Sequence, residues 1–377
     1  MYEPKTPQQI VSAIRNKDGG IIATCFCIQH LRQFQNSYQA LIGNNIITGL
    51  GGVWADALTE LFQAAQAETE AECFEQYLQS ISLIIREFST IPPHLSVPCI
   101  ISIAKSLRYF ATNVDYNESV SQMQKLLKLA LSIKTFKPGQ SPLLAIVNEL
   151  MAVYFMRNLY THAEKLLTSV DNDTHPIQYN LFSKSDVSCF RFYKGRISAI
   201  KGELKEARDN LTDALLKCPL DLYQNRRLIL LYLIPVQLPL GELPNIRDGF
   251  LTKYDLQIFD DFVIAIENGD LKLFDDAFER NQILFIKLGL FELMCKSRNV
   301  VYYQIFRMAH AQWNSEKVPV SVFQQSLSIF HPYTIMETES ILCLLIEEKK
   351  VKAYIHYGLH IVVFSKEKAF VPLSECA

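Results

Sequence analysis

The sequence predicts an all-α protein in which an irregular, TPR-like helical solenoid ends in a winged helix. Three observations predict this fold. Apolar residues recur with helical spacing along most of the 377-residue chain. Glycine is scarce, at 14 residues, which is about half of its usual share of roughly 7%. Near the C-terminus, three helical segments precede two β-branched runs that flank a glycine, a pattern typical of a wing.

Composition excludes several classes of protein. With 49% hydrophobic and 20% charged residues, the chain is not intrinsically disordered. The net charge of −2 excludes a polycation that coats nucleic acid, so any basic surface must be local. Nine scattered cysteines without a C-x-x-C predict reduced thiols, mostly in the core of a cytosolic or nuclear protein. The most apolar run, Leu228–Val236, is too short to span a membrane, and no signal peptide is visible, so we expect a soluble protein.

Residues 1–140 are predicted to form N-terminal helical repeats. Thr6 and Pro7 have the pattern of a helix N-cap followed by a first-turn proline. Glycine and proline pairs such as Pro92-Pro93 and Pro138-Gly139 separate the later helical patterns. These patterns cover residues 21–42, 53–66, 70–88, 98–112 and 117–135.

Residues 141–296 are predicted to form TPR-like helix pairs. Within Arg191–Pro219, small or apolar residues and a proline occupy positions 8, 20, 24, 27 and 32 of a tetratricopeptide-type pair: Gly195, Ala207, Leu211, Ala214 and Pro219. Small residues let two antiparallel helices touch closely, and Gly202 suits the turn between them. Weaker copies at Met151–Val170 and Phe262–Phe278 are unevenly spaced, which indicates an irregular solenoid.

Residues 297–377 are predicted to form the winged helix. Helical patterns at Val300–Trp313, Val322–Phe330 and Glu337–Glu348 supply its three helices, with a short β-branched stretch between the first two. Two further β-branched runs, Val351–His356 and His360–Phe364, flank a glycine and predict a two-stranded hairpin.

Four apolar runs resemble the PCI-domain family, specifically its branch in nuclear mRNA export, which includes a signalosome-associated relative. They are Phe192–Arg196, Asn225–Gly241, Ile283–Leu293 and Ile341–Ile355. The resemblance extends from about residue 140 to the C-terminus. It implies a non-catalytic scaffold and nucleic-acid-binding adaptor of the transcription-and-export complex at the nuclear pore, coupling transcription to export.

The resemblance also implies partners and a location. The partners would be a larger PCI scaffold of the GANP/Sac type, a small acidic subunit of the Sem/DSS type, and RNA or DNA bound mostly without sequence specificity. No membrane and no small-molecule substrate is expected. The location would be the nucleus at the pore, with the cytoplasm as a second location. Two alternatives remain open: a signalosome- or splicing-associated PCI subunit, and a peptide-binding TPR-like module without a nucleic-acid role.

No catalytic constellation, metal site or cofactor site emerges from the sequence. The motifs G-x-S-x-G and H-E-x-x-H and a Walker lysine do not occur. The glycines at 49–52 lack phosphate-loop spacing, and the calcium-like run at Asp171 lacks its glycine and glutamate. His356, His360 and Cys343 lack a convincing fourth ligand for zinc. The sequence therefore predicts that the protein is not an enzyme.

Basic residues around the wing are candidates for nucleic-acid binding, because lysines that flank a wing can contact phosphates. The alternative is a solvated hairpin rim, since neighbouring glutamates nearly cancel the charge and no aromatic residues suited to base stacking are obvious. The candidates are Lys349, Lys350, Lys352, Lys366, Lys368, Arg298 and Arg307.

A second basic cluster is a candidate groove for the acidic subunit. Residues 184–208 hold seven basic and three acidic residues, a local balance of +4. An acidic peptide could be steered there and held by apolar anchors. One alternative is an ordinary solvated helix face. For Arg226 and Arg227, which could extend the cluster, the alternative is pairing with Asp221. The candidates are Arg191, Lys194, Arg196, Lys201, Arg226 and Arg227.

Overall fold

The computed structural model describes residues 12, 16, 18–33, 52–132, 141–171, 177–246, 248–313 and 315–376. The chain forms two compact units, residues 1–193 and 194–377, which are described separately. The helix α11 (Lys184–Lys201) contributes residues to both units. The predicted helix start at Thr6–Pro7 and the predicted break at Pro138-Gly139 lie outside the described residues.

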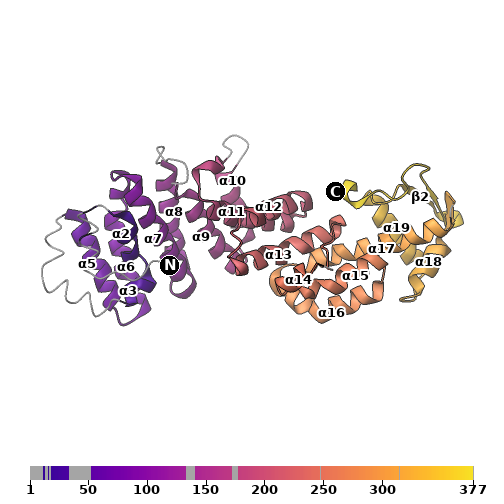
Figure 1. Ribbon diagram of the computed structural model, residues 1–377, viewed down its shortest axis with the longest axis horizontal. Coiled ribbons are helices and arrows are strands. Elements are labelled where there is room, and N and C mark those ends of the chain that lie inside the picture. Colours follow the sequence, from indigo (N-terminus) through magenta and orange to yellow (C-terminus); the bar gives the residue numbers. More distant parts are fainter. Residues whose placement is uncertain are drawn as a thin grey trace. The chain divides into compact units, whose positions relative to one another are not determined.

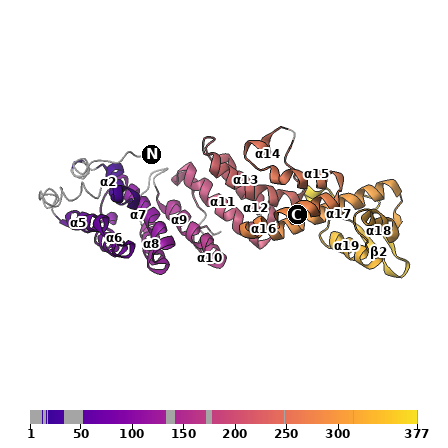
Figure 2. The same cartoon turned by 90° about the horizontal axis from the view of Figure 1, so that it is seen from below.

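Unit one is built from helices that pack as neighbouring pairs, as the helical periodicity predicts. The pairs α5/α6, α7/α8 and α9/α10 are in contact, and they appear in indigo to magenta in Figures 1 and 2. The helices are α2 (Gly19–Cys25), α3 (Ile28–Gln33), α5 (Gly52–Gln66), α6 (Glu70–Ile84), α7 (Pro93–Asn113), α8 (Tyr116–Ser132), α9 (Leu143–Met156) and α10 (Tyr160–Val170).

Local sequence signals explain where these helices begin. Thr69 and Glu72 form a reciprocal capping box that starts α6. The helix α7 begins at Pro93, five residues before the predicted stretch, because a proline fits the first turn of a helix. The proline pair therefore starts a helix here as well as ending the preceding segment.

Side chains in the core of unit one form hydrogen bonds with the backbone of a buried turn. The carbonyl of Phe26, between α2 and α3, accepts hydrogen bonds from the Tyr77 hydroxyl at 2.6 Å and the Ser106 hydroxyl at 2.8 Å. The amide of Ile28 donates to the same Ser106 oxygen at 3.1 Å. These bonds replace the water that the turn loses on burial.

The cysteines agree only in part with the expectation that most of them lie in the core, because Cys27, Cys189 and Cys343 are half-buried and Cys295 is exposed. The eight cysteines whose side chains the structure describes are free thiols, and Cys25, Cys73, Cys99 and Cys218 are buried. Burial raises the pKa of the Cys25 thiol to about 12. Among the described residues, no helix combines the length and the apolar character that a membrane crossing requires.

Unit two contains the remaining TPR-like helices followed by the winged helix. The apolar tract is buried within α13 (Tyr223–Gln237) from Ile229 to Val236, although its first residue, Leu228, is 42% exposed. The helices are α12 (Leu204–Lys217), α13 (Tyr223–Gln237), α14 (Phe250–Lys253), α15 (Asp260–Asn268), α16 (Leu271–Leu288), α17 (Phe291–Trp313), α18 (Val320–Ser328), α19 (Ile335–Glu347) and α20 (Leu373–Cys376). Short 3₁₀ turns lie between helices at Leu238–Leu240 and Gln257–Phe259, and another lies between two strands at Tyr357–Leu359.

The predicted TPR-like packing is confirmed where α11 meets α12. A Cβ atom at Gly195 would lie 2.7 Å from Cγ of Leu211 and 3.1 Å from the carbonyl oxygen of Ala207. Only glycine therefore permits this approach of the two helices. Gly202 adopts φ +81° in the turn between them, a conformation that glycine accepts readily. The pair α15/α16 repeats the arrangement, with Ala265 and Phe274 buried.

The winged helix has one more strand than the sequence predicts. Strands β2 (Ala353–His356) and β3 (Ile361–Phe364) form the expected hairpin, and β1 (Lys317–Pro319) pairs with the other edge of β3. The sheet is antiparallel with the order β1-β3-β2. The predicted two-stranded wing is thus incomplete, because the pairing of β1 depends on contacts with residues more than forty positions away, as in Lys317 with Val363.

The first winged-helix helix is also longer than predicted. The helix α17 starts at Phe291 and runs without interruption to Trp313. It contacts α13, α15 and α16 as well as α18 and α19, so it belongs to both the helical array and the winged helix. The predicted boundary between residues 296 and 297 falls inside this helix, and the division into three segments stays a prediction.

Candidate nucleic-acid and partner interfaces

Two of the predicted nucleic-acid residues are held by carboxylates within unit two. Arg298 on α17 donates two hydrogen bonds to Asp275 on α16, from Nε at 2.7 Å and from Nη2 at 2.6 Å. Burial opposes the charge of Arg298, but the bonds to Asp275 raise its pKa overall. Lys350 is only 8% exposed, and its ammonium lies 2.8 Å from Glu348. Both side chains therefore serve the packing of unit two rather than an exposed basic surface.

The other lysines around the wing are exposed. Lys366 lies 3.8 Å from Glu316 and Lys368 lies 3.4 Å from Glu375, and such exposed pairs contribute little stability. Lys352 precedes β2, and its backbone is fixed by hydrogen bonds with Ser365 and Ala369. Lys349 is exposed and adopts φ +58° where the chain leaves α19.

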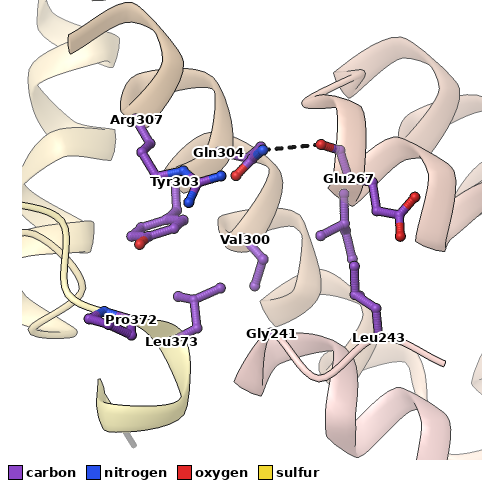
Figure 3. Close-up of a pocket in the computed structure, with 10 residues that line it drawn as sticks. Gly241, Leu243, Glu267, Val300, Tyr303, Gln304, Arg307, Pro372 and Leu373 are labelled. Atoms are coloured by element: carbon purple, nitrogen blue, oxygen red, sulfur yellow. Dashed lines mark hydrogen bonds between the residues drawn. The ribbon is translucent and has the colours of Figure 1, made fainter. Parts of the chain in front are cut away.

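Arg307 lies apart from the wing lysines in the sequence and lines a hollow in unit two. The hollow has a volume of about 410 Å³ and is bounded by α17, α15, the segment after α13 and the C-terminal tail. Figure 3 shows Tyr303, Gln304 and Arg307 projecting from α17 beside it. Gln304 donates a hydrogen bond to the carbonyl of Glu267 at 3.1 Å. Arg307 is exposed. It forms part of the wall of this hollow together with apolar side chains.

The helix α19 has the wrong charge for contact with a phosphate backbone. It stands third in the winged helix, and its exposed residues include Met336, Glu337 and Glu347. No lysine or arginine occurs within Ile335–Glu347. Carboxylates repel the polyanionic backbone of a duplex, so this helix is unsuited to a nucleic-acid groove.

Two of the three side chains weighed as zinc ligands, His360 and Cys343, have other partners. His360 Nδ1 lies 2.8 Å from a carboxylate oxygen of Glu339, and Cys343 Sγ lies 3.0 Å from the Tyr357 hydroxyl. Within the described ranges, no group of three or more histidine, cysteine or acidic side chains is arranged to hold a metal ion. These contacts instead attach the wing to α19.

The predicted groove for an acidic partner divides between the two units. In unit one, the Arg191 guanidinium lies over the Tyr179 ring at 4.4 Å. In unit two, the Arg196 guanidinium lies over the Tyr232 ring at 4.1 Å. Such contacts hold a guanidinium against an aromatic face. Each arginine therefore already has an aromatic partner within its own unit.

The remaining members of that set are also engaged. Lys194 lies 3.7 Å from Glu206, and Lys201 lies 2.9 Å from Glu203. Arg226 donates to the carbonyls of Leu215 and Cys218 at the end of α12, at 3.0 and 2.9 Å. Arg226 thus donates to carbonyls that have no partner within the helix, because the last turn of a helix leaves them without one. It bonds to these carbonyls rather than to Asp221, the partner considered from the sequence.

Arg227 donates to the carbonyl of Asp255 at 3.4 Å, a long bond that leaves the guanidinium exposed. The groove as a whole stays a prediction.

Sequence reasoning missed two exposed residues of the sheet, Lys317 and Tyr354. Lys317 belongs to the strand that was not predicted, and Tyr354 is 63% exposed on β2. The signal that could have found the tyrosine is the period of two along the predicted strand Val351–His356, which places Tyr354 on the opposite face from Val351 and Ile355.

Comparison with known proteins identifies relatives of the chain. A family described as PSMD3-like, N-terminal TPR repeats, matches residues 101–254. A PCI domain-containing protein 2 homolog from Dictyostelium discoideum is 30% identical over 257 residues, which cover 66% of this chain and 59% of the relative. PCI domain-containing protein 2 from Xenopus laevis is 27% identical over 298 residues, covering 74% and 73%.

A third relative, the protein CSN12 homolog from Yarrowia lipolytica, is 27% identical over 239 residues, covering 61% of this chain and 59% of the relative. The chain spans less than two thirds of the length of the Dictyostelium relative and of the two Caenorhabditis relatives, where it covers 57% and 56%. These matches agree with the TPR-like helices and the winged helix described above. In sequence, the chain is therefore similar to PCI-domain proteins.

Proposed function

We propose that this protein is a non-catalytic scaffold subunit and nucleic-acid-binding adaptor of a nuclear mRNA-export complex that couples transcription to export at the nuclear pore. The observation that carries the proposal is the winged helix that continues directly from TPR-like helices within unit two through the shared helix α17. The matches to PCI domain-containing protein 2 support the scaffold part of this proposal.

The mechanism is binding rather than bond-making. The helical array holds partner chains, and the winged helix lies beside the winged helix of a larger PCI scaffold of the GANP/Sac type. A small acidic subunit of the Sem/DSS type completes the assembly. Exposed large apolar side chains support a role in docking, since patches of this kind often mark protein interfaces. On α16, Ile283 is 66% exposed and Ile286 is 59% exposed.

Nucleic acid is bound by the exposed lysines of the winged helix, chiefly Lys352 and Lys366, through phosphate contacts. The acidic helix α19 argues against reading of base pairs in a groove, so binding is non-specific in sequence. The affinity of the isolated chain for nucleic acid is weak, because the exposed lysines of the winged helix are few and carboxylates lie near them. A partner's basic surface would raise it.

A second candidate function is that of a signalosome- or splicing-associated PCI subunit. It is retained because relatives with two different names, PCI domain-containing protein 2 and CSN12, both match the chain. The two candidates differ in the scaffold that the protein binds. A peptide-binding role without nucleic acid differs from both because it predicts no binding when RNA is titrated into the purified complex.

Affinity purification of the tagged chain, followed by identification of the bound chains, separates these functions. Recovery of a large PCI scaffold together with pore-associated proteins supports the proposal, whereas recovery of signalosome or splicing subunits favours the second candidate. Titration of RNA into the purified complex at several salt concentrations then tests the adaptor role. We expect affinity to fall as salt rises. A complex without measurable RNA affinity would contradict that role.

A further inference from the structure

The outer face of the three-stranded sheet presents an aromatic ring between lysines. Side chains alternate across a sheet, and Val318, Val362 and Phe364 are buried on its inner face. Their neighbours in sequence therefore point outward. The register places Lys317 of β1 opposite Val363 of β3, and Val363 opposite Tyr354 of β2. These three side chains form one row across the outer face, with Tyr354 63% exposed.

A second lysine lies on the same face beside the tyrosine. Lys352 stands two residues before Tyr354, and its carbonyl accepts a hydrogen bond from the Ser365 amide at 2.8 Å, which continues the pairing of β2 with β3. Residues two apart in a strand share a face, so Lys352 and Tyr354 point the same way. Within the described part of the chain, neither Lys317 nor Lys352 forms an ion pair through its ammonium.

The spacing across this face suits an extended polynucleotide strand. Adjacent strands lie roughly 4.8 Å apart, so Lys317 and Tyr354 stand on strands roughly 10 Å apart. Val363 between them leaves the row flat and apolar at its centre. A base that stacks on Tyr354 could therefore place its flanking phosphates near the ammonium groups on either side.

Charge distinguishes this face from the other exposed surface of the winged helix. Three ammonium groups lie on or beside it, those of Lys317, Lys352 and Lys366, against the carboxylates of Glu316 and Glu367. The helix α19 carries only carboxylates among its charged side chains. An anionic ligand is therefore favoured on the sheet, although the small excess of positive charge predicts weak binding.

We infer that the outer face of this sheet is a stacking platform for single-stranded nucleic acid, in which the Tyr354 ring stacks on a base while Lys317 and Lys352 contact phosphates. The inference rests on the proposed adaptor role and gives it a substrate class and a site. Stacking on an aromatic ring requires an unpaired base, because bases in a duplex are already stacked on one another. The platform therefore selects single strands without selecting their sequence.

Fluorescence anisotropy with labelled oligo(U), oligo(dT) and a duplex of equal length tests the platform, on the full chain alone and on the purified complex. Tyr354→Ala should weaken binding of both single strands by roughly 5- to 150-fold. Tyr354→Phe should bind nearly as tightly as the parent protein because it keeps the ring. Duplex binding should be unchanged by either substitution. Equal losses for oligo(U) and oligo(dT) indicate a platform that accepts RNA and DNA alike, and loss for one of them assigns the platform to that strand.

Matched variants control for charge and for exposed aromatic surface. Lys317→Glu and Lys352→Glu should weaken binding and reduce its salt dependence, whereas Lys205→Glu on the exposed face of α12 should not. Tyr357→Ala removes another exposed ring, 59% exposed, in the turn between β2 and β3, and should leave binding unchanged. Thermal unfolding of each variant shows whether it remains folded.

Different failures have different meanings. If the purified complex binds single strands and Tyr354→Ala binds as tightly as the parent, the platform is wrong while the adaptor role stands. Equal losses in Tyr357→Ala, or an equal loss of duplex binding, would also overturn the platform. If the parent complex binds none of the three probes, the adaptor role and the platform fail together, and the scaffold role is judged by the purification alone.

Discussion

Gly195 and Leu211 are in such close contact that a Cβ atom at position 195 would lie 2.7 Å from Cγ of Leu211. Leu211 is fully buried, so it has little room to move. We expect Gly195→Val to destabilise the protein by about 1–3 kcal/mol, because the helices must separate or repack. Chemical denaturation monitored by circular dichroism measures the change in the free energy of unfolding.

A double-mutant cycle shows whether this contact is the cause. Leu211→Ala alone should cost about 2–5 kcal/mol, as for other buried leucines. In the Gly195→Val background it should cost clearly less, since the smaller side chain relieves the overlap. Strictly additive losses would mean that Gly195 is required for another reason.

Gly241 and Gly249 provide a matched pair, because both adopt φ +73°. A Cβ atom at Gly241 would lie 2.5 Å from Cδ1 of Leu373 in the C-terminal tail, whereas a Cβ atom at Gly249 would meet nothing within 4 Å. Gly249→Ala should cost about 1–2 kcal/mol from the left-handed conformation alone. Gly241→Ala should cost about 1–3 kcal/mol more, from the overlap with Leu373.

Denaturation midpoints of the two glycine variants, measured side by side, give the comparison. Limited proteolysis adds a local readout, since displacement of Leu373 should expose the C-terminal tail to cleavage only in Gly241→Ala. Equal losses of stability in both variants would show that the tail adapts to the extra methyl group.

Arg298 is expected to act in stability rather than in nucleic-acid binding. Its two hydrogen bonds to Asp275 join α17 to α16. Arg298→Ala should destabilise the protein by about 1.5–3 kcal/mol, the usual contribution of hydrogen bonds to charged groups, since both side chains are partly exposed. Urea denaturation measures this loss, and an Asp275→Asn variant should lose a comparable amount. A large fall in RNA affinity with unchanged stability would contradict this role.

His310 is expected to make stability depend on pH. Burial against the rings of Phe364 and Phe370 lowers the pKa of His310 below its ordinary value of about 6.5. As pH falls below that value, the unfolded chain therefore takes up a proton more readily than the folded chain does. The free energy of unfolding should decrease with acidification through this window.

We compare the pH dependence of unfolding in the parent protein with that of His310→Phe, which keeps an aromatic ring but cannot titrate. Its free energy of unfolding should decrease less than that of the parent protein between neutral and mildly acidic pH. His356→Phe, at an exposed position on the wing, serves as the control and should follow the parent. Parallel pH dependences for the parent and His310→Phe would remove His310 as the cause.

Helical periodicity was sufficient to predict most of the fold. The close approach at Gly195 and the hairpin around Gly358 were predictable as well, because glycine spacing and β-branched runs are local signals. The third strand was not predictable, since three residues at Lys317–Pro319 become a strand only by pairing with β3. Likewise, the sequence shows that lysines surround the wing, but it does not show which of them are buried.

Local pattern thus determines helices, turns and the order of elements, because each depends on residues a few positions apart. Tertiary structure decides which charges remain available for a ligand. Arg298 is engaged by Asp275, a residue of the preceding helix, and Lys350 is buried and paired with the half-buried Glu348. The strand register alone brings Lys317 and Tyr354 into one row across Val363. Burial and pairing depend on contacts between distant segments, and these exist only once the chain has folded.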